Sequence, residues 1–238
     1  KALIYLAEPK KLDVFLQNHF GIGSLSDYIN GLEQEELSRW ESVQIASNSK
    51  LKSTRTFKGF LVNCYEPIQA ELNGNPFVLN PQDGSFTFIY DYEQFTLPGD
   101  ITVVGVENPE NFRYIAKQKK HFTDIKPLFV SRYPQSKDLL KWLQSILNNY
   151  LHFGDFDFAG LNIYANEFKK HFGARAAFYV PKNIDELLEK YGNRKLYNKQ
   201  QLHSGTRAIE EHSVIELIKL IEKHKKGLEQ EILIGWDI

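Results

Sequence analysis

Three acidic residues in the second half of the sequence have the chemistry needed to bind a divalent metal ion. Glu107 follows the apolar run at residues 101–106, and Asp155 and Asp157 follow another apolar run at 150–153. Open parallel sheets bind their ligands beyond the carboxyl ends of their strands, so we expect the three carboxylates to lie together. Hard cations such as Mg²⁺ or Mn²⁺ take oxygen ligands and keep waters that a phosphate can replace. Two ions held in this way would clamp the attacking and leaving oxygens of a phosphodiester.

The same acids also have a purely structural interpretation. Glu107 can support the start of the helix that follows it, and Asp155 and Asp157 can be turn and N-cap residues. Because Asp is common in turns, a single Asp-x-Asp pair would favour this interpretation. The placement of all three acids at the ends of two strands of one series favours the metal site instead.

The elements that must position these acids alternate between strands and helices from residue 101 onward. This alternation is typical of a parallel sheet covered by crossover helices, and it predicts an α/β fold with about four parallel strands. The expected strands are residues 101–106, 128–130, 150–153 and 176–180. Asn108 and Pro109 are typical of the N-cap and first residue of a helix, and Ser136 is typical of a second N-cap. A capping box at 213–216 predicts a later helix that ends at Gly227.

The first 99 residues have a different pattern and are predicted to form a separate, small α+β domain. Residues 1–45 have apolar side chains at helical spacing, and residues 58–97 contain short apolar strands with hairpin turns at 73–75 and 81–84. A turn signal at residues 97–100 marks the boundary. We therefore expect domains at 1–99 and 100–238, the second with a C-terminal helical extension, and we assign no chemistry to the first.

Two motifs resemble those of Toprim domains: Val-Val-Gly-Val-Glu-Asn at 103–108 and Gly-Asp-Phe-Asp-Phe-Ala-Gly at 154–160. The sequence is most similar to the nuclease subunit of Wadjet-type anti-plasmid systems and more distantly resembles the A subunit of type IIB topoisomerases. The resemblance implies a Toprim fold in which Glu107 acts as general acid or base while Asp155 and Asp157 hold Mg²⁺. It also implies DNA as substrate, with RNA as the alternative, and an SMC-type complex as partner. Separately, the wide apolar face of the helix predicted from residue 213 could pack on the sheet, which is the default, or form the interface of a homodimer. Hydrolysis is favoured over strand passage because we identify no tyrosine nucleophile.

A second acidic pair, Glu229 and Glu231, resembles a stretch near the carboxyl end of the Wadjet-type nucleases. It could complete a second metal site beside Glu107, Asp155 and Asp157. However, the letters Gly-Leu-Glu-Gln-Glu at 227–231 also occur earlier in the sequence, where nothing catalytic is apparent, and this favours a structural role. Both interpretations stay open.

Basic residues near the predicted site could bind the phosphates of a nucleic acid. They surround the first helix and second strand of the series: Arg113, Lys117, Lys119, Lys120, Lys126, Arg132 and Lys137. The nucleic-acid-binding residues that we predict are Arg113, Lys117, Lys195 and Arg207. The alternative is a solvated helix face, which runs of charge usually form. His152, on the strand that leads to the aspartates, is more often a packed core residue than a ligand.

The bulk composition limits the classes of protein. The net charge is −1, with 42% hydrophobic and 25% charged residues, which is typical of a globular protein and argues against nonspecific coating of nucleic acid. No apolar run reaches the roughly 18 residues of a membrane span, and no signal-peptide pattern opens the sequence, which predicts a cytoplasmic protein. The single cysteine, Cys64, excludes a disulfide framework and a Cys-rich zinc site.

We therefore predict a Mg²⁺- or Mn²⁺-dependent endonuclease that hydrolyses DNA phosphodiester bonds in defence or in DNA processing. The alternative is a non-catalytic Toprim subunit that binds nucleic acid or supports the assembly of a complex. A phosphotransferase is disfavoured because the sequence lacks the Gly-rich phosphate loop of nucleotide-binding enzymes.

Overall fold

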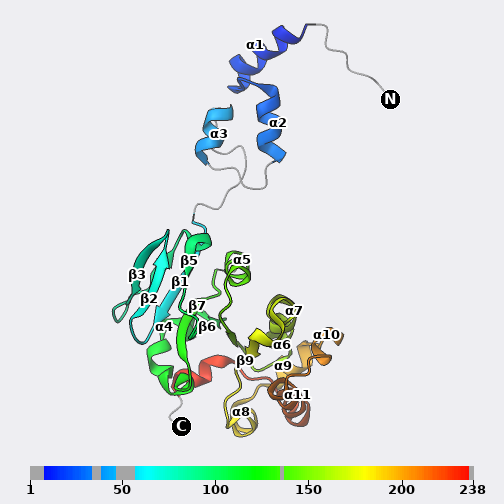
Figure 1. Cartoon of the computed structure of the whole chain (residues 1–238). Helices are drawn as coiled ribbons and strands as arrows, with labels where there is room; N and C mark the ends of the chain where they lie inside the picture. Colours follow the sequence, from blue (N-terminus) through cyan, green and yellow to red (C-terminus); the bar gives the residue numbers. More distant parts are fainter. Residues whose placement is uncertain (1–7, 34–38, 47–56, 135–136, 236–238) are drawn as a thin grey trace. The chain divides into compact units, whose positions relative to one another are not determined.

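The computed structural model describes residues 8–33, 39–46, 57–134 and 137–235, and the chain divides into two compact units, residues 1–57 and 58–238 (Figure 1). The described residues of the first unit form three helices, α1 (Pro9–Phe20), α2 (Leu25–Glu33) and α3 (Arg39–Ala46). Helix α1 ends where Gly21 takes a left-handed conformation with a φ of 66°, as is common after helices. The helical character expected for residues 1–45 is confirmed for the part that the structure describes.

A six-stranded sheet forms the centre of the second unit, in the order β4-β1-β7-β6-β8-β9. Four strands run parallel: β6 (Ile101–Val106), β7 (Lys126–Ser131), β8 (Tyr150–Phe153) and β9 (Ala176–Phe178). Two further strands are antiparallel, β1 (Phe60–Cys64) and β4 (Thr87–Ile89). Most residues of β6 and β7 are buried, including those on opposite faces of the sheet, and this explains the continuous apolar runs of these strands. The predicted α/β class is confirmed.

A second, antiparallel sheet contains β2 (Ile68–Leu72), β3 (Asn75–Leu79) and β5 (Phe95–Thr96). The β2–β3 hairpin turns at Asn73 and Gly74, whose φ angles of 53° and 72° are typical of a tight type I′ turn. The turn predicted at 73–75 is therefore confirmed. The hairpin predicted at 81–84 is wrong, because β3 belongs to the small sheet whereas β4 pairs with β1 in the large one.

The predicted domain boundary near residue 100 differs from the division of the structure, which falls between Phe57 and Lys58. Strand β1 lies between β4 and β7, so residues before 100 complete the same sheet as the parallel strands. The buried Trp142 of α5 (Asp138–Ser145) stacks on Phe95, with ring centroids 5.4 Å apart, and its Nε1 donates to the Phe95 carbonyl at 2.7 Å. Residues 58–99 therefore share one hydrophobic core with the rest of the second unit.

Helices and 3₁₀ segments connect the strands. α4 (Pro109–Arg113) and η2 (Ile115–Phe122) join β6 to β7, and α5 joins β7 to β8. One continuous helix with π-type hydrogen bonding in its middle follows β8, formed by α6 (Phe158–Ile163), η3 (Tyr164–Lys169) and α7 (Lys170–Phe172). The remaining segments are η1 (Tyr92–Gln94), η4 (Gly173–Arg175), α8 (Ile184–Tyr191), α9 (Arg194–Lys199), α10 (Ser204–Arg207), α11 (His212–His224) and η5 (Gln230–Ile234).

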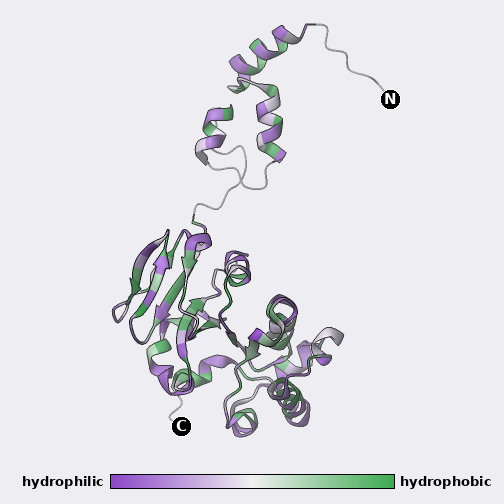
Figure 2. Ribbon diagram, in the orientation of Figure 1, coloured by the Kyte–Doolittle hydropathy of each residue, from purple (hydrophilic) through white to green (hydrophobic). Residues whose placement is uncertain are grey.

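Hydrophobic residues lie along the central strands, whereas the helices carry both hydrophobic and hydrophilic residues (Figure 2), as expected for helices with one buried face. No helix within the described ranges is long and apolar enough to cross a membrane.

The first crossover helix begins as predicted. The side chain of Asn108 accepts the backbone N–H groups of Glu110 at 2.7 Å and Asn111 at 3.4 Å, and Pro109 is the first residue of α4. Ser136, which was expected to cap the next helix, lies outside the described residues. The structure begins α5 at Asp138.

The predicted limits of the last long helix have to be corrected. Helix α11 begins at His212 after Glu211, and the Ser213 hydroxyl bonds to the Glu211 carboxylate instead of capping the helix. The helix ends where Lys225 takes a left-handed conformation with a φ of 52°, before the predicted Gly227. Ser213 lies inside the first turn of α11, and its hydroxyl donates to the carboxylate of Glu211, the residue just before the helix.

Candidate functional site

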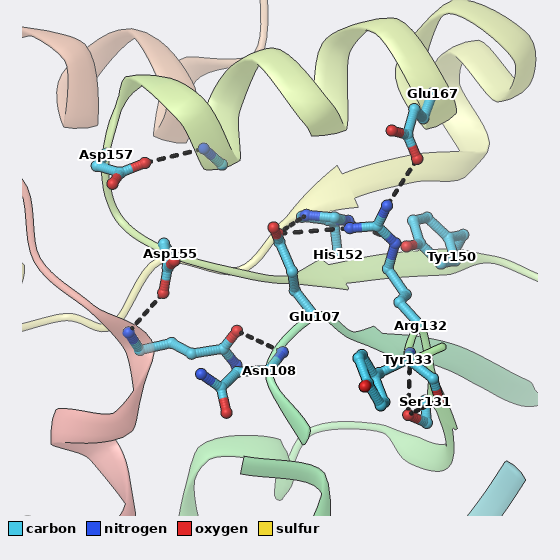
Figure 3. A network of polar contacts seen from close by, with 12 residues as sticks. Glu107, Asn108, Ser131, Arg132, Tyr133, Tyr150, His152, Asp155, Asp157 and Glu167 are labelled. Carbon is cyan, nitrogen blue, oxygen red and sulfur yellow. Dashed lines mark hydrogen bonds and ion pairs between the residues drawn. The ribbon is translucent and has the colours of Figure 1, made fainter. Parts of the chain in front are cut away.

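The register of the parallel sheet brings Glu107 and the loop of Asp155 to one edge (Figure 3). Strands β6 and β8 pair with Val106 opposite Phe153, and the backbone N–H of Glu107 donates to the Phe153 carbonyl at 2.9 Å. Asp155 follows β8 closely, and Asp157 stands at the start of α6. The structure therefore places the three acids at the carboxyl edge of the sheet, where the sequence predicted them.

Two buried side chains hold the carboxylate of Glu107. Its Oε2 atom lies 3.2 Å from Nε2 of His152 and 3.5 Å from Nη1 of Arg132. His152 is fully buried on β8, and its Nδ1 atom lies 3.0 Å from the Tyr150 hydroxyl. When Tyr150 donates to Nδ1, the proton of the neutral imidazole is on Nε2 and is donated to Glu107.

This environment keeps Glu107 ionised. Burial acts to raise the pKa of Glu107, but the hydrogen bond from His152 and the charge of Arg132 act against it, and the pKa lies below its ordinary value. Complete burial lowers the pKa of His152, so the permanent positive charge beside Glu107 is the guanidinium of Arg132. No described residue hydrogen-bonds to the other carboxylate oxygen, Oε1.

Arg132 is a buried cation that connects two glutamates. It follows β7 directly, its side chain is 7% exposed, and its Nη2 atom lies 2.6 Å from Oε2 of Glu167. The guanidinium also lies over the Phe168 ring, 5.0 Å from the centroid. The sequence grouped Arg132 with exposed phosphate-binding cations, whereas the structure places it inside the unit, where it orients Glu107. An arginine directly after a buried apolar strand is the signal that could have distinguished it.

Asp155 lies in the most negatively charged part of the site. Its Oδ1 atom accepts the backbone N–H of Gln230 at 2.9 Å. Burial raises the pKa of Asp155 to about 7, against the effect of this hydrogen bond. The charges that add to the increase belong to Asp157, Glu107 and Glu231. The ionised form of Asp155 is therefore disfavoured by its burial and by the three carboxylates around it.

Asp157 caps helix α6 and is buried. Its Oδ1 atom accepts the N–H of Gly160 at 2.9 Å, and its Oδ2 atom accepts from Nε2 of Gln200, just after α9, at 2.7 Å. The structural interpretation of Asp157 as an N-cap is therefore confirmed. A Cβ atom on Gly160 would overlap the carbonyl oxygen of Asp155, so the close approach of the helix to this loop requires glycine.

The segment at 228–231 closes the site from the carboxyl-terminal side. Backbone groups of Phe156 and Leu228 exchange hydrogen bonds at 2.8 and 3.1 Å. Nδ2 of Asn108 donates to Oε1 of Glu231 at 2.5 Å. The Oε2 atom of Glu231 is buried and has no hydrogen-bond partner among the described residues.

The two members of the second acidic pair lie in different environments. Glu231 is half-buried and contributes to the raised pKa of Asp155. Glu229 is exposed and is not among the charges that affect this pKa. The structure therefore brings Glu231, but not Glu229, to the three predicted acids.

Within the ranges that the structure describes, no three side chains of His, Cys, Asp or Glu are grouped as ligands of one ion. The reason is that the carboxylates turn toward separate protein partners: Glu107 toward His152, Asp155 toward the backbone of η5, and Asp157 toward α6. The donor set nevertheless fits a hard divalent cation, because every charged donor is an oxygen. A positive ion would give the unpartnered buried oxygen of Glu231 a partner, and it would offset the burial and the neighbouring charges that raise the pKa of Asp155.

The predicted nucleic-acid-binding residues occupy different positions. Arg113 and Lys117 both lie over the ring of Tyr114, with Cζ 5.2 Å and Nζ 4.6 Å from its centroid. Lys195 is exposed in the first turn of α9. Gln200, which donates to Asp157, directly follows this helix. Arg207 pairs with a glutamate of α11 at 3.1 Å, so this cation is already engaged within the protein.

Comparison with known sequences assigns most of the second unit to one family. Residues 89–238 match the model of a family described as a domain of unknown function, DUF7281. No curated protein is detectably similar to the sequence. The family match extends over more than half of the chain, and it includes the parallel strands β6 to β9 and all the acids of the candidate site. The chain therefore belongs to the DUF7281 family.

Proposed function

We propose that the protein is a Toprim-type nuclease that hydrolyses phosphodiester bonds of DNA with Mg²⁺ or Mn²⁺. The observation that carries the proposal is the gathering of four carboxylates at the carboxyl edge of a parallel sheet: Glu107, Asp155, Asp157 and Glu231. The motifs at 103–108 and 154–160 support the finer assignment of the fold as Toprim. Their resemblance to anti-plasmid nucleases supports a role in defence.

The acids divide into two roles in this proposal. Asp155, Asp157 and Glu231 would hold the metal, which supplies positive charge to the phosphate oxygens when it is bound. Glu107 acts as the general base. Its Oε2 atom is fixed by His152 and Arg132, while Oε1 has no described donor and can accept a proton from the attacking water.

The experiment that tests the proposal is incubation of the purified protein with supercoiled plasmid in Mg²⁺, in Mn²⁺ and in EDTA. We expect nicking or linearisation with either metal, none in EDTA, and none with the Glu107→Gln or Asp155→Asn variants. Asp185→Asn is the matched control, since this exposed aspartate of α8 pairs with His224 away from the four carboxylates, and it should cut like the unmodified protein. Cleavage that survives both site variants would refute the assignment of the site.

A non-catalytic subunit that binds nucleic acid or supports assembly is the second candidate function. It is favoured by the protein partners that the carboxylates already have, most clearly the capping role of Asp157. Under this function the protein binds plasmid without cutting it, and calorimetry detects no Mg²⁺ binding. An SMC-type partner or a homodimer is compatible with either function, and a measurement of mass in solution tests the homodimer.

A further inference from the structure

A groove at the start of α4, close in sequence to Glu107, has the composition of a site for a nucleobase. It encloses about 580 Å³ between helix α4 and the segment that precedes β4. Its lining includes the aromatic residues Phe86, Phe112, Tyr114 and Tyr133 together with Arg113. We propose that this groove binds an unpaired nucleotide of the nucleic-acid substrate. The inference rests on the proposed nuclease function, because it names the form of nucleic acid that the same site takes.

The groove opens at the same edge of the sheet as the acids. Its lining includes Pro109 of the Glu107 turn and Ser131, which lies opposite Val106 where β6 and β7 end. Figure 3 draws the ring of Tyr133 beside the turn that carries Glu107. A nucleotide in the groove would therefore place its neighbouring phosphate toward the carboxylates.

The aromatic side chains offer flat surfaces at the mouth of the groove. Tyr133 is 62% exposed and Phe86 is 38% exposed. The backbone of Tyr133 is fixed, since Ser131 Oγ donates to its carbonyl at 2.9 Å and accepts from its N–H at 3.2 Å. Phe86 rests on the buried Phe112, with ring centroids 5.0 Å apart. Rings that are held in place but exposed are suited to stacking against a base, which offers a flat face whatever its identity.

Two cations complement the charge of a phosphate beside this groove. Arg113 and Lys117 are both exposed, and neither forms an ion pair with a carboxylate of the described residues. Some other exposed cations of the second unit do pair with a carboxylate, as Lys126 does with Asp100 and Arg207 with a glutamate. Free positive charge next to aromatic faces is the combination that binds single strands.

The geometry favours an unpaired nucleotide over a base pair. In a duplex each base is stacked on both sides and paired at its edge, so it cannot enter a groove without being extruded. A nucleotide in a single-stranded end, bubble or nick has a free face that can stack on Tyr133. The protein should therefore prefer DNA with a single-stranded segment near the bond that it cuts.

Fluorescence anisotropy of a short labelled oligonucleotide, measured in EDTA with the full chain, tests the groove without requiring cleavage. We expect the single strand to bind more tightly than the blunt duplex of the same sequence. Tyr133→Ala should weaken binding of the single strand about tenfold, while Tyr133→Phe should stay within about twofold because it keeps the ring. Arg113→Ala should reduce the dependence of binding on salt. Tyr90→Ala is the matched control, because Tyr90 is a 53% exposed aromatic residue after β4 that does not line the groove.

Two outcomes would overturn the inference: single-strand binding that does not change in Tyr133→Ala, or duplex binding of equal strength with the same dependence on Tyr133. If plasmid is cleaved and either outcome is observed, the nuclease proposal is supported and only the nucleotide-binding role of the groove is refuted. Binding that depends on Tyr133 in a protein that never cuts would support the groove and remove the nuclease proposal.

Discussion

The Asp155→Asn substitution should make the metal-free protein more stable, although it removes a residue of the candidate site. Burial and the charges of Asp157, Glu107 and Glu231 raise the pKa of Asp155 to about 7, so the ionised carboxylate is unfavourable in the folded state. Asparagine has nearly the same shape, and its side-chain oxygen can still accept the backbone N–H of Gln230. The substitution therefore removes charge and leaves the packing in place.

The size of the effect follows from the shift in pKa. The pKa of Asp155 changes from 3.8 to about 7 on folding, so the folded state holds the proton more tightly than the unfolded state. Stability is therefore lost as the pH rises between these two values, and the loss is complete above pH 7. At about 1.4 kcal/mol for each pKa unit, the upper limit is on the order of 4 kcal/mol. Because water reaches part of the site, we expect about 2 kcal/mol.

Urea unfolding in EDTA at several pH values, with and without Mg²⁺, measures this effect. Above pH 7 Asp155→Asn should be more stable than the unmodified protein, and the difference should disappear near pH 4. Mg²⁺ should stabilise the unmodified protein by mass action and the variant much less. Asp185→Asn should give no gain above pH 7, because hydrogen bonds from His224 and Lys223 lower the pKa of Asp185. Equal stability of Asp155→Asn and the unmodified protein above pH 7 would show that burial and the neighbouring charges do not raise the pKa of Asp155 as we argue.

Three further substitutions test the support of the site and the core. Gly154→Ala would push a Cβ atom into the Glu107 carboxylate, so cleavage should fall at least a hundredfold while stability falls about 1–3 kcal/mol; plasmid nicking and thermal unfolding separate the two effects. Arg132→Met leaves Glu107 and Glu167 without their cation and should cost about 3 kcal/mol in urea unfolding, and an unchanged midpoint would contradict the buried pairing. Trp142→Phe removes the indole N–H that donates to a carbonyl of β5 and should cost roughly 2 kcal/mol, whereas a loss below the error of the measurement would contradict a shared core.

The sequence was most informative where one strand or turn determines its own pattern. The parallel strands are continuous apolar runs because both faces of the sheet are covered there. The turn after β2 could be predicted from Asn73 and Gly74 alone, because both residues readily take a positive φ. Strand β2 has only a weak signal of its own, because its alternation of Ile68, Gln69 and Ala70 is short and follows a proline. The boundary was misplaced because the pairing of β1 with β7 joins segments far apart in the sequence, which local periodicity cannot reveal.

The same distinction applies to the site. The ends of β6 and β8 could be found from the sequence, and so could the acids that follow them. The contacts of Glu107 with His152 and Arg132 could not, since they require β6 to lie between β7 and β8. Likewise, the placement of Glu231 rather than Glu229 in the site depends on the backbone bridge at Leu228 and on the hydrogen bond from Asn108 to Glu231.

The bridge between Phe156 and Leu228 also has a consequence for the time at which the site forms during synthesis. The parallel strands and Asp155 leave the ribosome well before Leu228, but the backbone N–H that binds Asp155 belongs to Gln230. The nascent chain can therefore build its sheet and still lack one wall of the site. The metal site and any activity that depends on it should therefore be completed only after residues 228–231 have emerged and docked.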